Sequence, residues 1–139
     1  MIDMTVEIKR IRIGTDIRMR VNFSVAGSYM SWDDVSDISC WLICDSQRTR
    51  HDDVTFEIGG TPEDLYVKWL ACNQRYDGLY RLAVRFVIDG DTRTFDAPAF
   101  ELVKSSEGIG SYEYTLVTED GLNVVTEGNE NESILITTL

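Results

Sequence analysis

The sequence predicts an all-β fold: an immunoglobulin-like antiparallel β-sandwich of about seven strands, with a C-terminal β-hairpin and strand as an extension. Apolar and polar residues alternate along most of the chain, which is the pattern of strands with one buried face. Asp-Gly pairs interrupt the alternation, and this dipeptide favours tight turns because both residues tolerate a positive φ. Candidate strands follow one another roughly every 8–13 residues, a spacing typical of sandwiches and barrels rather than parallel α/β sheets.

Residues 16–25 (DIRMRVNFSV) form the clearest predicted strand, with apolar residues on one face and charged or polar residues on the other. Residues 5–13 (TVEIKRIRI) also alternate, but the apolar positions change face at Lys9–Arg10. That change predicts a bulge or a strand that passes from one sheet to the other. Residues 37–44 (DISCWLIC) are apolar on both faces, which predicts a strand covered on both sides.

Four more strands are predicted at residues 54–58, 65–72, 78–88 and 92–103. Pro98 interrupts the last of them and predicts an edge strand or a bend, because proline lacks the backbone donor of a sheet ladder.

Two short segments, SWDD (31–34) and TPED (61–64), carry a Ser or Thr followed three residues later by an acid. This capping pattern predicts a single helical turn in each.

The last part of the chain is predicted to be an extension of a sandwich domain that spans residues 1–104. Residues 105–110 are typical of a linker, residues 111–127 of a hairpin that turns at Asp120-Gly121, and residues 133–139 of a final strand. An extension of this size (105–139) is too small for its own core. It is therefore expected to pack on the sandwich or on another subunit.

The stretch YDGLYRLAVRF (76–86) predicts the tyrosine corner of an immunoglobulin-like sandwich. In that corner a tyrosine near the start of a strand hydrogen-bonds backbone a few residues upstream. Asp77 and Gly78 would form the turn, and Tyr80 would supply the hydroxyl. Leu82 stands where antibody domains have their second cysteine, so no disulfide is expected. The predicted core residues are Phe23, Trp41, Trp69, Leu82 and Phe86, with the two tryptophans as competing candidates for the central position.

Three segments together resemble the immunoglobulin-like modules found in tail and baseplate proteins of phages and prophages of gut bacteria. They are IRIGTDIRMRVNFSV, VSDISCWLICDSQ and LYVKWLACNQRYDGLYRLAVRFVIDG with the closing FDAPAFELV, within about residues 8–103. The resemblance implies a structural or adhesive module in a multi-subunit assembly, with no chemistry of its own. A location in a virion or in the cytoplasm is expected, since no signal peptide is visible.

The composition of the chain limits the classes of partner that it is expected to bind. The chain has 139 residues and a formal net charge of −11, which argues against nucleic acid and anionic membranes because both need a basic surface. No apolar run approaches the ~20 residues of a spanning helix. A local basic cluster predicts either the solvent face of two strands or a patch for an acidic partner or neighbouring subunit. It consists of Lys9, Arg10, Arg12, Arg18 and Arg20.

No catalytic or metal-binding set is predicted, and no cofactor. His51 is expected to be a solvated loop residue, since adjacency to Asp52 in the sequence is not the geometry of a catalytic dyad. Cys40 and Cys44 would lie about 13 Å apart on one strand face, too far for a disulfide or one zinc ion. An odd number of cysteines with no visible signal peptide predicts reduced thiols. Residues 89–96 lack the ligand order of a calcium loop and favour a hairpin turn.

Aromatic residues leave two possibilities open. Trp32, Tyr112 and Tyr114 are predicted to lie on loops or outer faces, as are Tyr29, Tyr66 and Tyr76. Such residues could form a flat row that binds a glycan, or they could cover a neighbouring strand or subunit. The expected function is a non-catalytic structural module with protein partners, a homo-oligomer through residues 111–117 and 133–138. Glycan or ligand binding is the alternative.

Overall fold

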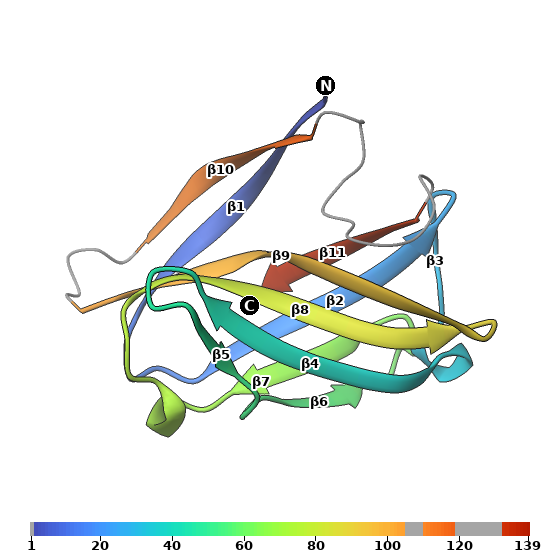
Figure 1. Ribbon diagram of the computed structural model, residues 1–139, viewed down its shortest axis with the longest axis horizontal. Coiled ribbons are helices and arrows are strands. Elements are labelled where there is room, and N and C mark those ends of the chain that lie inside the picture. Colours follow the sequence, from blue (N-terminus) through green and yellow to red (C-terminus); the bar gives the residue numbers. More distant parts are fainter. Residues whose placement is uncertain (1, 105–109, 119–131) are drawn as a thin grey trace.

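The computed structural model describes residues 2–104, 110–118 and 132–139, and the side chains of all of these except 2–6, 111 and 113–118. Two β-sheets pack face to face (Figure 1), which confirms the all-β sandwich. Sheet A has the strand order β10-β1-β9-β8-β4-β5 and sheet B the order β11-β2-β7-β6, with the short β3 paired to β2.

The strands of sheet A, in sheet order, are β10 (Gly110–Thr118), β1 (Ile2–Arg12), β9 (Asp91–Val103), β8 (Gly78–Ile88), β4 (Ser36–Cys44) and β5 (Thr49–His51). Those of sheet B are β11 (Glu132–Thr138), β2 (Ile17–Val25), β7 (Leu65–Trp69) and β6 (Thr55–Ile58), with β3 (Ser28–Tyr29) beside β2. Two single-turn 3-10 helices, η1 (Trp32–Asp34) and η2 (Ala71–Asn73), connect strands.

The topology is immunoglobulin-like. Strands β9-β8-β4 face strands β2-β7-β6, which correspond to the G-F-C and B-E-D strands of that fold. β1 pairs in parallel with β9 over Lys9–Arg12. β11 pairs antiparallel with β2, and so takes the place that the first strand of an immunoglobulin domain takes beside strand B.

The face change at Lys9–Arg10 reflects a change of neighbours. β1 pairs with β10 from Ile2 to Arg10 and with β9 from Lys9 onward, in continuous register and within one sheet. The prediction of a bulge or a passage between sheets is therefore wrong. Only the last residues of β1 pair with β9, whereas the earlier ones pair with β10 alone. The apolar residues before and after Lys9–Arg10 therefore have different neighbours.

Pro98 lies at a β-bulge in β9. Arg81 pairs with Pro98 whereas the preceding Tyr80 pairs with Phe100, so Ala99 is the extra residue. β1 pairs only with residues 100–103 of β9, so Pro98 lies outside this pairing. The predicted bend is thus a bulge, where a missing backbone donor is tolerated.

The predicted turns have three different outcomes. Asp89-Gly90 forms the two-residue turn between β8 and β9, with φ values of 52° and 82°. Asp77-Gly78 is not a hairpin turn: it ends the passage that carries the chain from sheet B to sheet A. Asp120-Gly121 lies outside the described residues.

The predicted helical turns also differ. At SWDD, η1 forms and the side chain of Ser31 accepts a hydrogen bond from the Asp33 backbone N–H at 3.2 Å. At TPED the chain makes a turn closed by Asp64 N–H to the Thr61 carbonyl, and no helix forms.

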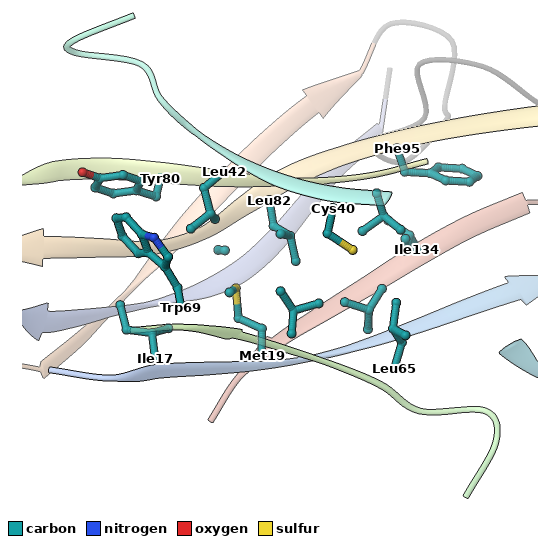
Figure 2. Packing of buried hydrophobic residues seen from close by; sticks show 14 of the residues in the cluster. Ile17, Met19, Cys40, Leu42, Leu65, Trp69, Tyr80, Leu82, Phe95 and Ile134 are labelled. Carbon is teal, nitrogen blue, oxygen red and sulfur yellow. The ribbon is translucent and has the colours of Figure 1, made fainter. Parts of the chain in front are cut away.

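The core fills the space between the sheets (Figure 2). Four of the five predicted core residues, Phe23, Trp69, Leu82 and Phe86, are at most 1% exposed and belong to this cluster. The ring centroids of Phe23 and Phe86 are 4.8 Å apart in an edge-to-face contact, a favourable aromatic geometry.

Trp41 is the exception, because it lies on the outer face of sheet A. Its neighbours Cys40 and Leu42 point into the core, so strict alternation along β4 turns Trp41 outward. It is nevertheless only 7% exposed, since the guanidinium groups of Arg50 and Arg85 lie 4.1 and 5.1 Å from its ring centroid. Of the two predicted core tryptophans, Trp69 therefore holds the central position. Residues 37–44 are covered on both sides as predicted, by the core on the inner face and by arginine side chains on the outer face.

Candidate interaction surfaces

The tyrosine corner is present and has a structural role. Tyr80 is fully buried, and its hydroxyl donates a hydrogen bond of 2.6 Å to the carbonyl of Tyr76. Burial raises the pKa of Tyr80, and the nearby Cys44 thiol adds to this rise. Gly78 has a φ of 132°, which residues with a side chain rarely adopt, and a Cβ there would displace the Ser46 hydroxyl, which lies 2.8 Å away. Asp77 forms an exposed ion pair with Lys104 at 3.7 Å.

His51 is not the solvated loop residue that was expected. It ends β5, is half-buried, and its ring lies 5.4 Å from Trp69 and 5.8 Å from Tyr80 between centroids. Its Nε2 is 3.1 Å from the hydroxyl of Thr49. Pairing of β5 with β4 brings the ring against the core, a long-range contact that local sequence does not contain.

The three cysteines are free thiols in different surroundings. Cys40 and Cys44 are buried, and Cys72 is exposed. Burial raises the pKa of Cys40 to about 12, so this thiol is a poor nucleophile at neutral pH. Among the described residues, no cluster of three or more His, Cys, Asp or Glu could hold a metal ion. Nor does this part of the chain contain a helix with the length and hydropathy needed to span a bilayer.

Two of the six aromatics that could form a binding row, Trp32 and Tyr112, have other roles in the structure. Trp32 is 1% exposed, and its indole N–H donates to the Val21 carbonyl at 3.1 Å, so the expected exposure of Trp32 is wrong. The short helix η1 turns this large ring inward, where it contacts Phe86 edge-to-face at 5.1 Å. Tyr114 pairs with Val6 through its backbone, and its side chain lies outside the described ones.

Tyr112 fastens β10 to the rest of sheet A. Its hydroxyl donates to a Glu101 carboxylate oxygen at 2.9 Å, and the Arg10 guanidinium lies 4.5 Å from its ring centroid. Arg10 also pairs with Glu101 at 3.7 Å. These contacts join β10, β1 and β9, so the Tyr112 side chain packs on neighbouring strands.

The C-terminal strands extend both sheets of the sandwich. β10 pairs with β1 in a register from Ile2↔Thr118 to Arg10↔Gly110. β11 pairs with β2 from Glu132↔Val25 to Thr138↔Met19. The second arm of the predicted 111–127 hairpin lies outside the described residues.

β11 also bridges to sheet A along the side of β9 that β1 leaves unpaired (Figure 1). Nε of Arg93 donates to both carboxylate oxygens of the buried Glu132, at 2.9 and 3.2 Å. The hydroxyl of Thr138 donates to the Ala99 carbonyl at 2.7 Å, and Ile134 enters the core. β11 therefore closes the gap between the two sheets on this side.

A hollow lies on the outer face of sheet B. This sheet B depression, with a volume of about 650 Å³, is bordered by β2, β7, β6 and the loop after β6. Arg18, Tyr66 and Lys68 contribute side chains from the two central strands, and Glu57 and Gly59 lie on the β6 side. Sequence reasoning placed Arg18 in the basic cluster and Tyr66 among the outer aromatics. The alternation of residues 65–72 was the available signal that Lys68 joins them.

The loop beside the depression is held in place. Asn22, which is buried, donates its side-chain amide to the Glu63 carbonyl at 2.9 Å and to the Asp64 carboxylate at 2.7 Å. The Trp32 backbone N–H donates to the Pro62 carbonyl at 2.8 Å. The loop beside the depression is thus tied to both β2 and η1.

Comparison with models of protein families, with curated proteins and with solved structures finds nothing that matches this chain.

Proposed function

We propose that the chain is a non-catalytic assembly module that acts through protein–protein contacts, in a phage- or prophage-type tail or baseplate structure. The phage context rests on the sequence resemblance. The assembly role is supported by one structural observation, the way in which β11 is held.

β11 adds to sheet B as an edge strand, and it lies between β2 and β9. The edge of β2 supplies the backbone ladder, and β9 supplies the partners for Glu132 and Thr138. The same hydrogen bonds form whether the strand comes from this chain or from a second copy. Such an exchange would join copies without any new surface, and we expect it to link a homo-oligomer through residues 132–138.

A disulfide trap tests this exchange in the full chain. The hydroxyl oxygens of Ser24 and Ser133 are 2.7 Å apart across the β2–β11 ladder, a placement suited to a disulfide after Ser24→Cys and Ser133→Cys. Cys72→Ser removes the exposed native thiol, and Ser133→Cys alone serves as the control.

The protein is refolded at high concentration, oxidised and separated on a non-reducing denaturing gel. We expect covalent dimers and larger species from the double variant, and none that depend on the trap from the control. If only internally crosslinked monomer forms, and light scattering of the unmodified chain shows a monomer at every concentration, the assembly role is excluded. Neighbouring genes for tail or capsid proteins would support the phage context.

The alternative of a glycan-binding aromatic row loses two of its six candidate residues, Trp32 and Tyr112. Trp32 is buried, and Tyr112 is occupied by Glu101 and Arg10.

A further inference from the structure

We propose that the sheet B depression binds a carboxylated sugar, with Arg18 and Lys68 holding the carboxylate and the Tyr66 ring packing against the sugar. This site goes beyond the assembly role, and of the six aromatics expected on loops or outer faces it uses Tyr66 alone.

Positively charged side chains lie close together on the outer face of sheet B. Arg18 and Lys68 are direct cross-strand partners on the outer face, and Arg20 is the partner of Tyr66 one step along. Like charges placed opposite each other destabilise a sheet. None of these three cations forms an ion pair with a carboxylate in the described part of the chain, although the chain has 24 acids and only 13 Lys and Arg.

Five other cations of the protein have a carboxylate partner, whereas Lys9, Arg12, Arg48, Arg75 and Arg85 have none among the described residues. The five with a partner are Arg10, Arg50, Arg81, Arg93 and Lys104. Arg18 and Lys68 are distinguished by their position, because these two unpaired cations face each other across the ladder beside a hollow. An anion bound between Arg18 and Lys68 would relieve their repulsion and receive charge-assisted hydrogen bonds from both.

The ring of Tyr66 is held in place beside the depression. Tyr66 is half-buried, and its ring lies so close to Gly59 that a Cβ there would be 2.5 Å from its Cε2 atom. The backbone N–H of Gly59 donates to the Asp64 carbonyl at 2.9 Å, and Asn22 ties Asp64 to β2. The ring therefore lies against a loop that is tied to β2, and its exposed part can pack against the apolar face of a sugar.

Glu57 narrows the choice of ligand. It pairs across the ladder with Tyr66 and borders the same depression. Its carboxylate can accept hydrogen bonds from hydroxyl groups but repels a second negative charge on the ligand. A ring compound with one carboxylate and several hydroxyls matches this set, whereas an acidic protein segment with successive carboxylates does not. The volume of about 650 Å³ falls within the ~300–1,000 Å³ of small-molecule sites.

Titration of the full chain with glucuronic acid, followed by NMR amide shifts and calorimetry, tests the site. We expect saturable binding with shifts at residues 18, 57–60 and 66–68, and no saturation with glucose. Arg18→Gln and Lys68→Gln should each weaken binding by about tenfold or more, because each removes a charge-assisted contact. Arg75→Gln is the matched control, since Arg75 is exposed, lies outside the depression and forms no ion pair with a described residue.

A second readout separates binding from folding. Removing either Arg18 or Lys68 charge should leave the Tm of the unliganded chain unchanged or higher, because repulsion is relieved. A marked fall in Tm would mean that the pair stabilises the fold, and would overturn the argument from charge.

Alanine substitutions at two neighbouring glycines test whether the Tyr66 ring contributes to binding. Gly59→Ala must displace the Tyr66 ring and should weaken glucuronic acid binding, whereas Gly60→Ala meets nothing within 4 Å and should not. Equal effects of the two substitutions would refute the role of Tyr66. The proposal fails if glucuronic acid does not saturate, if glucose binds equally well, or if a short polyglutamate peptide binds more tightly. The last result would identify an acidic protein partner instead.

Discussion

Replacing Tyr80 by phenylalanine removes a single oxygen atom from the corner between sheets B and A. The ring keeps its contacts with Trp69 and Phe100, whose centroids lie 5.1 and 5.3 Å away. What disappears is the hydrogen bond of 2.6 Å from the hydroxyl to the Tyr76 carbonyl. This bond ties the passage after η2 to the start of β8.

The expected cost follows from the burial of the two partners. Tyr80 is fully buried, so the lost hydrogen bond counts in full, at about 1 kcal/mol. Tyr76 is 40% exposed, so water can reach this part of the loop and limit the penalty for the carbonyl left behind. We expect a free-energy loss of about 1–1.5 kcal/mol, or a fall in Tm of about 3–5 °C for a domain of this size.

Urea denaturation followed by tryptophan fluorescence measures this loss. Tyr76→Phe is the control, because the bond uses the Tyr76 carbonyl and not its side chain. A loss below about 0.3 kcal/mol for Tyr80→Phe, or an equal loss for Tyr76→Phe, would show that the corner does not stabilise the fold as its geometry implies.

Two further properties follow from burial and from the backbone. At pH 8 an alkylating reagent should modify Cys72 and spare Cys40, as read by mass spectrometry, and rapid labelling of Cys40 would contradict its burial. Because the pKa of Cys40 rises from 9.0 to about 12 on folding, its burial contributes fully to stability below about pH 9. That contribution is lost between about pH 9 and pH 12, where the urea midpoint should fall less for Cys40→Ala than for the unmodified chain. Gly90→Ala should cost about 1 kcal/mol because its φ is +82°, whereas Gly60→Ala should not; equal midpoints would refute the strain.

The two proposals concern different parts of sheet B and can fail separately. Exchange of β11 affects the edge of β2 and the contacts with β9. Arg18, Tyr66 and Lys68 all come from β2 and β7, which remain in one chain in either form. A monomer that binds glucuronic acid would therefore exclude the assembly role alone.

Much of the fold could be predicted because strands and turns are local. The alternation in 16–25 and 78–88 sets the spacing of buried side chains, and Tyr80 with its glycine marks the corner. Phe23, Leu82 and Phe86 follow from the same alternation. Local sequence cannot show which face of a strand will meet the other sheet, however, when both faces are apolar.

The tryptophans show this limit. All three are large and apolar, and a single sequence does not rank them. Trp41 faces outward because its neighbours fill the inner side of β4, and two arginines from other strands cover it. Trp32 is buried because η1 folds over the core. In each case residues distant in sequence decide the exposure.

The sequence by itself determined the class of fold, the corner and most of the core, because these depend on alternation and turn chemistry within a few residues. Only the tertiary structure decided where the last strands go and what the outer faces carry. β11 closes the sandwich through Arg93 and Ala99, and Lys68 meets Arg18 across the ladder. Such contacts depend on pairing and register between distant strands, which the pattern of any one strand leaves open.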